Sequence, residues 1–151
     1  MRSALAPTEL STFRHFDQRG EIVYSLVSTQ LYYKLTENEK RDALEVYASM
    51  FSEDEYTFDD AGAEEFSRAL GGARVTFLDG EGNVVGESEA DRIEEDHSDR
   101  AEIRDAMQYG SGYAVRSSDT LSRDMMYYCV AAEADGQRVY VRVAEFMISS
   151  W

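Results

Sequence analysis

The stretch "DMMYYCVAAEADGQRVYVRVAEFM", residues 124–147, decides the fold. Two runs rich in apolar residues flank Asp135-Gly136, a dipeptide typical of a two-residue hairpin turn. In the first run both alternating sets of side chains are apolar, so that strand must be covered on both faces. In the second run three alternating valines form one core face, whereas Tyr140 and Arg142 share a more polar face. The stretch therefore predicts two long strands of a sheet that is covered on both sides.

Shorter strands are expected upstream of this hairpin. Residues 74–79 and 83–88 alternate with a period of two and are separated by "GEG", so they predict a second hairpin. Residues 112–117 predict a further strand. Between these strands, Asp99 followed by Glu102 resembles a capping box, and the helix that it starts should end at Gly110.

The N-terminal third reads as helix. Apolar residues recur every three or four positions over residues 8–35, which predicts a long amphipathic helix. A capping box that begins at Thr36 predicts a second helix that runs to about Phe51. A third, short helix is expected to be capped by Asp60 and stopped by Gly71-Gly72.

The order of these elements predicts an α+β fold. It is a PAS-like five-stranded antiparallel sheet with long N-terminal helices and one helix inserted between strands 2 and 3. With 151 residues, the chain is expected to form a single domain. Residues 1–72 would form its helical part and residues 73–148 its sheet core.

Composition excludes several classes of function. The formal net charge is −15, which opposes binding to nucleic acid because phosphate contacts need Lys or Arg. A single cysteine, Cys129, allows neither an intrachain disulfide nor a cysteine-based zinc site, and it is expected to be a buried, inert thiol. No run approaches the ~20 apolar residues that span a bilayer.

The second half of the chain, over residues 74–145, resembles the extracytoplasmic sensor region of phosphate-regulon-type sensor histidine kinases. Two positions depart from that pattern, because Glu87 and Asp96 stand where Asp and Asn are usual. The matching positions are Asp79, Gly82, Val84, Ser88, His97, Arg100, Glu102, Gly110, Arg116, Ser118, Thr120, Met125 and Tyr127.

This resemblance implies a PAS-like (single Cache) fold and a sensing role without catalysis by the domain itself. It implies that the chain is the extracytoplasmic part of a membrane-bound kinase, a transferase, with flanking transmembrane helices that the sequence lacks. It also implies a homodimer in which the helix over residues 8–35 lies along the dimer axis. It implies no cofactor, and it does not identify the signal.

His97 stands among carboxylates in "EEDHSDRAEIRDAM", residues 94–107. Three interpretations stay open: the ring orders a loop by hydrogen bonding, it contributes to a ligand or metal site, or it takes part in catalysis with Asp96. Because Asp99 and Glu102 are explained by the capping box, we predict no metal site and favour the structural role. The acidic run over residues 52–60 is likewise expected to be solvated rather than to bind a cation.

Arg116 alternates with Ser118 and Thr120, so an anion could bind on that face of the strand. Alternatively, Arg116 pairs with a carboxylate such as Asp119 or Asp91. If a pocket exists, we expect it between this sheet face and the loop over residues 89–98. The candidate ligand-binding residues are Arg116, Ser118, Tyr127, Tyr128, His97 and Arg100.

Paired tyrosines in a strand point to opposite faces, so one of Tyr127 and Tyr128 should line the pocket and the other the core. Two rivals to the sensor remain. One is a pocket-free protein-interaction or dimerisation module of a membrane signalling protein, and the other is an enzyme built on His97 and Asp96.

Overall fold

A computed structural model of the chain describes residues 34, 36–89, 100–118 and 123–147. The chain divides into two compact units, Met1–Lys40 and Arg41–Trp151, and the sheet lies in the second. The predicted helix over residues 8–35 lies almost wholly outside the described residues. So do the loop that carries His97, the alternative partners Asp91 and Asp119, and Thr120.

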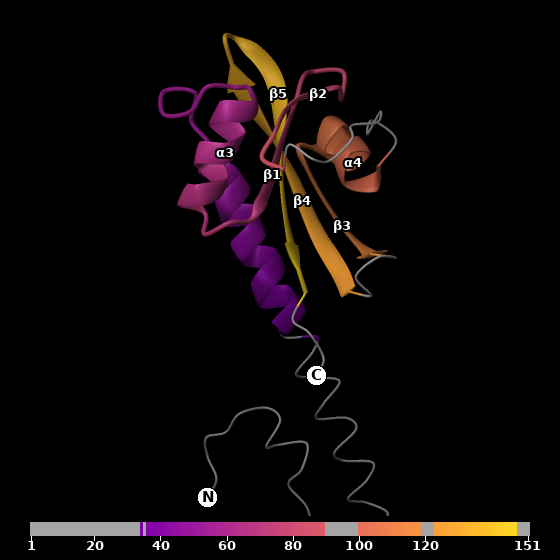
Figure 1. The fold of residues 1–151 in the computed structure, drawn as a ribbon. Coiled ribbons are helices and arrows are strands. Elements are labelled where there is room, and N and C mark those ends of the chain that lie inside the picture. Colours follow the sequence, from indigo (N-terminus) through magenta and orange to yellow (C-terminus); the bar gives the residue numbers. More distant parts are fainter. Residues whose placement is uncertain (1–33, 35, 90–99, 119–122, 148–151) are drawn as a thin grey trace, which may run out of the picture. The chain divides into compact units, whose positions relative to one another are not determined.

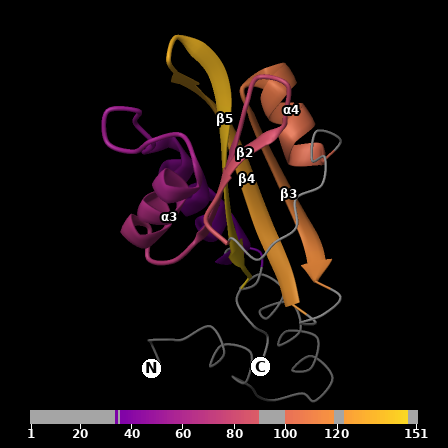
Figure 2. The same ribbon diagram turned by 45° about the horizontal axis from the view of Figure 1, so that its top comes forward.

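Five antiparallel strands form one sheet, as predicted, and their order is β2-β1-β5-β4-β3 (Figures 1 and 2). The turn between β4 and β5 is confirmed at Asp135-Gly136, where both residues have positive φ angles, 54° and 74°. The strands are β1 (Arg74–Leu78), β2 (Val84–Glu87), β3 (Ser111–Ser118), β4 (Arg123–Ala134) and β5 (Gln137–Phe146).

Helices cover both faces of the sheet. Helix α3 (Asp60–Ala69) lies on one face and α4 (Ala101–Tyr109) on the other, inserted between β2 and β3 as predicted (Figures 1 and 2). A helical segment over residues 36–49 precedes α3. Because Thr36 itself has helical backbone, it is not an N-cap, so the predicted capping box there is wrong.

The start of α3 also differs by one residue from the prediction. The N-cap is Asp59, whose Oδ1 accepts the Gly62 N–H at 2.9 Å, and not Asp60. At the other end, the predicted stop is confirmed, because Gly71 and Gly72 have φ angles of 82° and 103°.

The α3 face carries the larger apolar core. Phe77 stacks on Phe58 with ring centroids 4.4 Å apart, and Phe51 meets Phe77 edge-on at 5.1 Å. Phe58 and Tyr56 come from the acidic run over residues 52–60, so the aromatic residues of that run pack on the core. The buried residues of this core are Leu44, Ala48, Ala63, Phe66, Leu70, Ala73, Val75, Phe77, Met126, Tyr128, Val130, Val141 and Val143.

The α4 face has a smaller apolar cluster, to which α4 contributes Ile103 and Ala106. Cys129 is buried there, as expected, and burial raises the pKa of its thiol to about 12. Much of the remaining α4 face is charged, and these charged side chains form the candidate site.

Candidate functional site

A continuous chain of ion pairs and hydrogen bonds crosses the α4 face of the sheet. We call it the α4-face network. Strands β1, β2, β3 and β5 and helix α4 each contribute one or two side chains to it. Strand β4 contributes no hydrogen bond, but the ring of its Tyr127 packs against two of the network's arginines. Its members are Arg74 and Thr76 of β1, Glu87 of β2, Glu102 of α4, Arg116 of β3 and Arg142 of β5.

Glu102 is the centre of the network and is fully buried. Its carboxylate accepts two parallel hydrogen bonds from Arg116, at 2.6 Å and 2.7 Å, and a third from Arg142 Nη1 at 3.1 Å. Burial alone would raise the pKa of Glu102, but the hydrogen bonds and charge of Arg116, together with the charge of Arg142, outweigh burial and hold it below the ordinary value. The carboxylate is therefore ionised and joins α4 to β3 and β5.

Arg142 continues the network toward β1 and β2. Its Nη2 donates to the Thr76 hydroxyl at 3.1 Å, and that hydroxyl donates to Glu87 Oε1 at 2.9 Å. Arg74 holds the same carboxylate through two hydrogen bonds of 3.0 Å. Burial and the nearby charge of Arg74 lower the pKa of Arg142.

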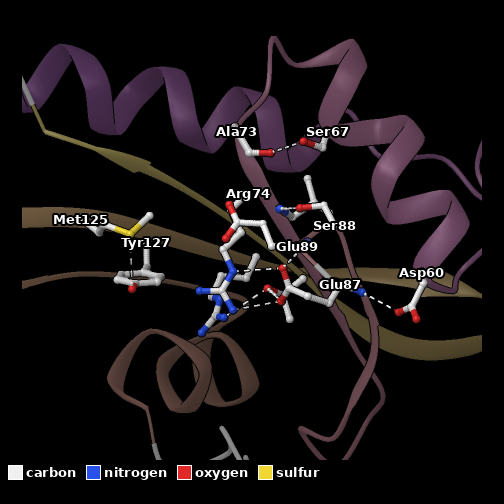
Figure 3. A network of polar contacts seen from close by, with 12 residues as sticks. Asp60, Ser67, Ala73, Arg74, Glu87, Ser88, Glu89, Met125 and Tyr127 are labelled. Carbon is white, nitrogen blue, oxygen red and sulfur yellow. Dashed lines mark hydrogen bonds and ion pairs between the residues drawn. The ribbon is translucent and has the colours of Figure 1, made fainter. Parts of the chain in front are cut away.

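The β2 end of the network reaches α3. Figure 3 shows Glu87 between the guanidinium of Arg74 and the start of α3, where its backbone N–H donates to Asp60 Oδ1 at 3.0 Å. Asp60, expected as a helix cap, thus holds β2 instead. Ser88, next in the chain, accepts the Val75 N–H at 2.9 Å and pairs the same two strands.

Two guanidinium groups contact the ring of Tyr127. The Cζ atoms of Arg116 and Arg142 lie 3.9 Å and 5.1 Å from the ring centroid. The Tyr127 hydroxyl donates to Met125 Sδ at 3.8 Å. Tyr128 lies on the opposite face in the α3 core, which confirms that the paired tyrosines divide between the two faces.

The position of α4 depends on a glycine in β3. A Cβ at Gly112 would clash with the carbonyl oxygen of Glu102 and would lie 2.8 Å from Asp105 Cβ. The helix backbone therefore lies directly on β3, which brings the Glu102 side chain within reach of Arg116. Gly110 ends the helix in the left-handed region, with φ of 97°, as predicted.

The predicted role of Glu102 is wrong. Helix α4 has Arg100 as its N-cap, with no side-chain hydrogen bond to the cap, and the Glu102 carboxylate points into the network instead. A capping box and a buried acidic residue in the first helical turn have the same sequence spacing. Here the carboxylate binds Arg116 and Arg142 beneath α4, so it does not cap the helix.

The structure brings together only some of the predicted site residues. Arg116 contacts Tyr127, and its carboxylate partner is Glu102. The backbone of Ser118 ends β3 opposite Arg123, and Arg100 lies at the start of α4. Tyr128 is separated from the others by the sheet, and His97 lies outside the described residues. Ligand binding by these residues stays a prediction.

Five network residues escaped the sequence analysis as site residues: Arg74, Thr76, Glu87, Glu102 and Arg142. One signal could have found Arg142. It stands between two core valines in a sheet that had to be covered on both faces, and a buried arginine needs a carboxylate partner. Its partner is 40 positions away, which no local pattern reveals.

Two further findings concern the described part of the chain. No helix within it is long and apolar enough to cross a membrane. No group of three or more His, Cys, Asp or Glu side chains within it could hold a metal ion.

The chain resembles known proteins at the level of family and fold. The family model described as Single Cache-like matches residues 32–145. No curated protein matches the chain. A solved structure with 17% sequence identity and a TM-score of 0.40 is the extracellular domain of a protein named as a histidine kinase, rpHK1S-Z16. The similarity covers 59% of this chain and 40% of that one, so less than half of the solved chain is matched.

Proposed function

Because the chain belongs to the single Cache-like family, we propose that it is the extracytoplasmic sensing module of a membrane-bound sensor histidine kinase. The motif positions from Asp79 to Tyr127 favour the phosphate-regulon type of such kinases. The module is non-catalytic, and kinase activity would belong to the cytoplasmic part of the parent protein. Flanking transmembrane helices would hold the module at the outer face of the cell membrane.

The observation that carries this proposal is the joining of α4 to β5 through Glu102 and Arg142. Strand β5 ends at Phe146, close to the point where the chain would lead back to the membrane. A ligand or partner that binds one position of α4 better than another shifts the population of that position. Through the buried ion pair, this shift would displace β5 and so change the balance between the two states of the kinase.

A small ligand would reach the network at Arg116. Its side chain is 27% exposed, whereas Glu102 and Arg142 are buried. Arg100 and Ser118 lie at the ends of α4 and β3 and complete the described part of the predicted ligand site. The sensor proposal thus includes an anionic or other small-molecule signal.

A second copy of the chain is the proposed partner. In the helical segment over residues 36–49, Leu44 and Ala48 face the core, whereas Val46 and Met50, the residue directly after the segment, are 57% and 56% exposed. The two exposed side chains are four positions apart, so they lie on one side of the helix. Pairing with the same helix of a second copy would bury them.

A pocket-free interaction module is the second candidate. Both terminal nitrogens of Arg116 are engaged by Glu102, and the ring of Tyr127 packs against the same guanidinium. The side chains expected to line a pocket therefore already satisfy one another. This candidate predicts that no small molecule changes the thermal stability of the domain, while the dimer still forms.

The test is a chimeric kinase in which the 151-residue chain replaces the extracytoplasmic domain of a characterised sensor kinase with a transcriptional reporter. Glu102→Gln should change reporter output several-fold, because it breaks the link between α4 and β5. Arg116→Lys, which retains the charge but loses the two parallel hydrogen bonds, should act in the same direction. Arg138→Gln, at an exposed position in the β4–β5 hairpin, is the matched control. Unchanged output from both network variants at normal protein level would refute the proposal.

A further inference from the structure

A cavity lies at the end of the sheet where its two hairpin turns meet. The two turns share that end because Leu78, the last residue of β1, pairs with Tyr140 near the start of β5 (Figure 1). The cavity has a volume of about 370 Å³, which is within the usual range of small-ligand sites. It is lined by Phe58, by the β1–β2 hairpin and by the β4–β5 hairpin, and it shares no residue with the α4-face network.

Part of the cavity lining is apolar and belongs to the α3 side of the sheet. Phe58 packs on the α3-face core, and Val139 alternates with two core valines of β5. Val85 is one of the few large apolar side chains that the described part of the chain leaves exposed, at 40%. A ligand with an apolar body would remove this surface from water.

The charged part of the lining is predominantly negative. Asp79, Glu81 and Asp135 contribute carboxylates, and Arg138 is the one basic residue among the described lining residues. The Arg138 Nε–H donates to the Tyr140 hydroxyl at 3.0 Å, and Tyr140 lies in the apolar cluster beneath α4. The guanidinium is therefore held on the other face of the sheet, and the cavity retains an excess of negative charge. A hollow lined by charge of one sign concentrates ions of the opposite sign.

Two of these carboxylates are available to a ligand. Within the described part of the chain, the carboxylates of Glu81 and Asp135 form no hydrogen bond and no ion pair. Asp79 Oδ1 accepts the N–H groups of Glu81 and Asn83, both at 2.9 Å, and so fixes the β1–β2 turn. Burial alone would raise the pKa of Asp79, but these hydrogen bonds outweigh burial and hold it below its ordinary value. Asp79 therefore keeps its negative charge while it holds the turn.

The cavity thus combines an apolar lining with unused acceptors and an excess of negative charge. We propose that it binds a small primary alkylamine, with the ammonium group toward the carboxylates and the alkyl chain against Phe58 and Val85. An ammonium group donates three hydrogen bonds and accepts none, which suits carboxylates that only accept. An inorganic cation would leave the apolar side chains exposed, and an anionic ligand would be repelled. The site stands without the proposed function, and only a role of the amine as a signal would rest on that function.

The experiment is a titration of the 151-residue chain with butylammonium chloride at neutral pH, followed by the backbone amide resonances in ¹⁵N–¹H spectra. We expect saturable shifts for Gly80 and Val139 at the cavity and none for Ala106 in α4. No saturable shift, or an equal shift with sodium chloride at the same ionic strength, would overturn the site. An equal shift with n-butanol, or a larger one with sodium butyrate, would overturn its assignment to cations. A stronger response to lysine blocked at both ends would overturn the free amine in favour of a partner protein's side chain.

A pair of charge-matched variants gives the second arm. Glu81→Gln with Asp135→Asn removes two charges from the cavity, and asparagine tolerates the φ angle of 54° at that position. The affinity for butylammonium should fall about fivefold or more. Glu133→Gln with Asp105→Asn removes two exposed charges from the α4 side, and the affinity should change less than about twofold. Equal losses in both variants, or none in the first, would overturn the site. If the amine binds but leaves the chimeric kinase silent, the site stands and its role as a signal fails.

Discussion

The two faces of this sheet are stabilised by different kinds of interaction. On the α3 face, aromatic and aliphatic side chains pack without directional bonds, as in the contact of Phe77 with Phe58. On the α4 face, a buried carboxylate and its arginines set the position of the helix. Apolar packing weakens in proportion to the atoms removed, whereas a buried ion network depends on whether every partner remains. The α4 face is thus the one that a small chemical change can switch.

The largest expected effect comes from breaking the network at its centre. Glu102→Gln should destabilise the domain by about 3–5 kcal/mol, because it leaves the buried Arg142 and the partly buried Arg116 without a carboxylate. Chemical denaturation measures this loss. Glu133→Gln, at an exposed position in β4, should change stability by less than about 0.5 kcal/mol. A loss below about 1 kcal/mol for the Glu102 variant would show that the two faces do not differ as described.

Removing Glu102 together with both of its arginines should be less harmful than removing Glu102 alone. Glu102→Leu combined with Arg116→Met and Arg142→Met eliminates these three charges together, and similar replacements in other proteins are often neutral or stabilising. We expect the triple variant to be more stable than Glu102→Gln in the same denaturation assay. On the α3 face the order should be opposite, with Phe77→Ala and Val143→Ala together losing more than either alone. A triple variant that is less stable than the single one would contradict the network account.

Acid should weaken the α4 face selectively. The pKa of Glu102 in the folded protein lies below its ordinary value of 4.5, so the unfolded chain takes up the proton more readily. The stability that Glu102 contributes is therefore complete above that value and is lost as the pH falls toward the folded pKa. The difference in unfolding free energy between wild type and Glu102→Gln should shrink below about pH 4.5. A difference that stays constant with pH would remove the electrostatic explanation.

The smallest expected effect is a change in the rate at which a thiol reagent labels Cys129. Because burial raises its pKa to about 12, the thiol should react negligibly with a thiol reagent at pH 8 in the folded protein. Glu102→Gln should speed labelling, since Cys129 lies in the apolar cluster beneath α4. Glu133→Gln should leave the rate unchanged. Rapid labelling of the wild-type domain would show that the α4 face admits solvent and reagent to Cys129.

Local patterns predicted most of the framework. The alternation in residues 124–147 and the Asp135-Gly136 turn were sufficient for β4 and β5, and Gly110 was sufficient for the end of α4. These features depend on neighbours in the chain, so sequence spacing reports them. The division of Tyr127 and Tyr128 between the faces follows from the same two-residue period.

The candidate site could be predicted only in part. Arg116 and Tyr127 were identified, but Glu102 was assigned to a helix cap because its spacing from Asp99 fits that role equally well. The partner of Arg142 is 40 positions distant, and Arg74 and Glu87 are 13 apart on paired strands. Which carboxylate meets which arginine depends on strand register and on the close approach that Gly112 permits, and the sequence shows neither directly.

The central claim is that Glu102 holds α4 on the sheet independently of the α3 core, and amide hydrogen exchange tests it most directly. In Glu102→Gln, amides of α4 and the adjacent β3 should exchange faster than in wild type, by a larger factor than those of α3, which report the other face. An equal increase in all elements would mean that the network contributes only to global stability. No increase in α4 would contradict the claim outright.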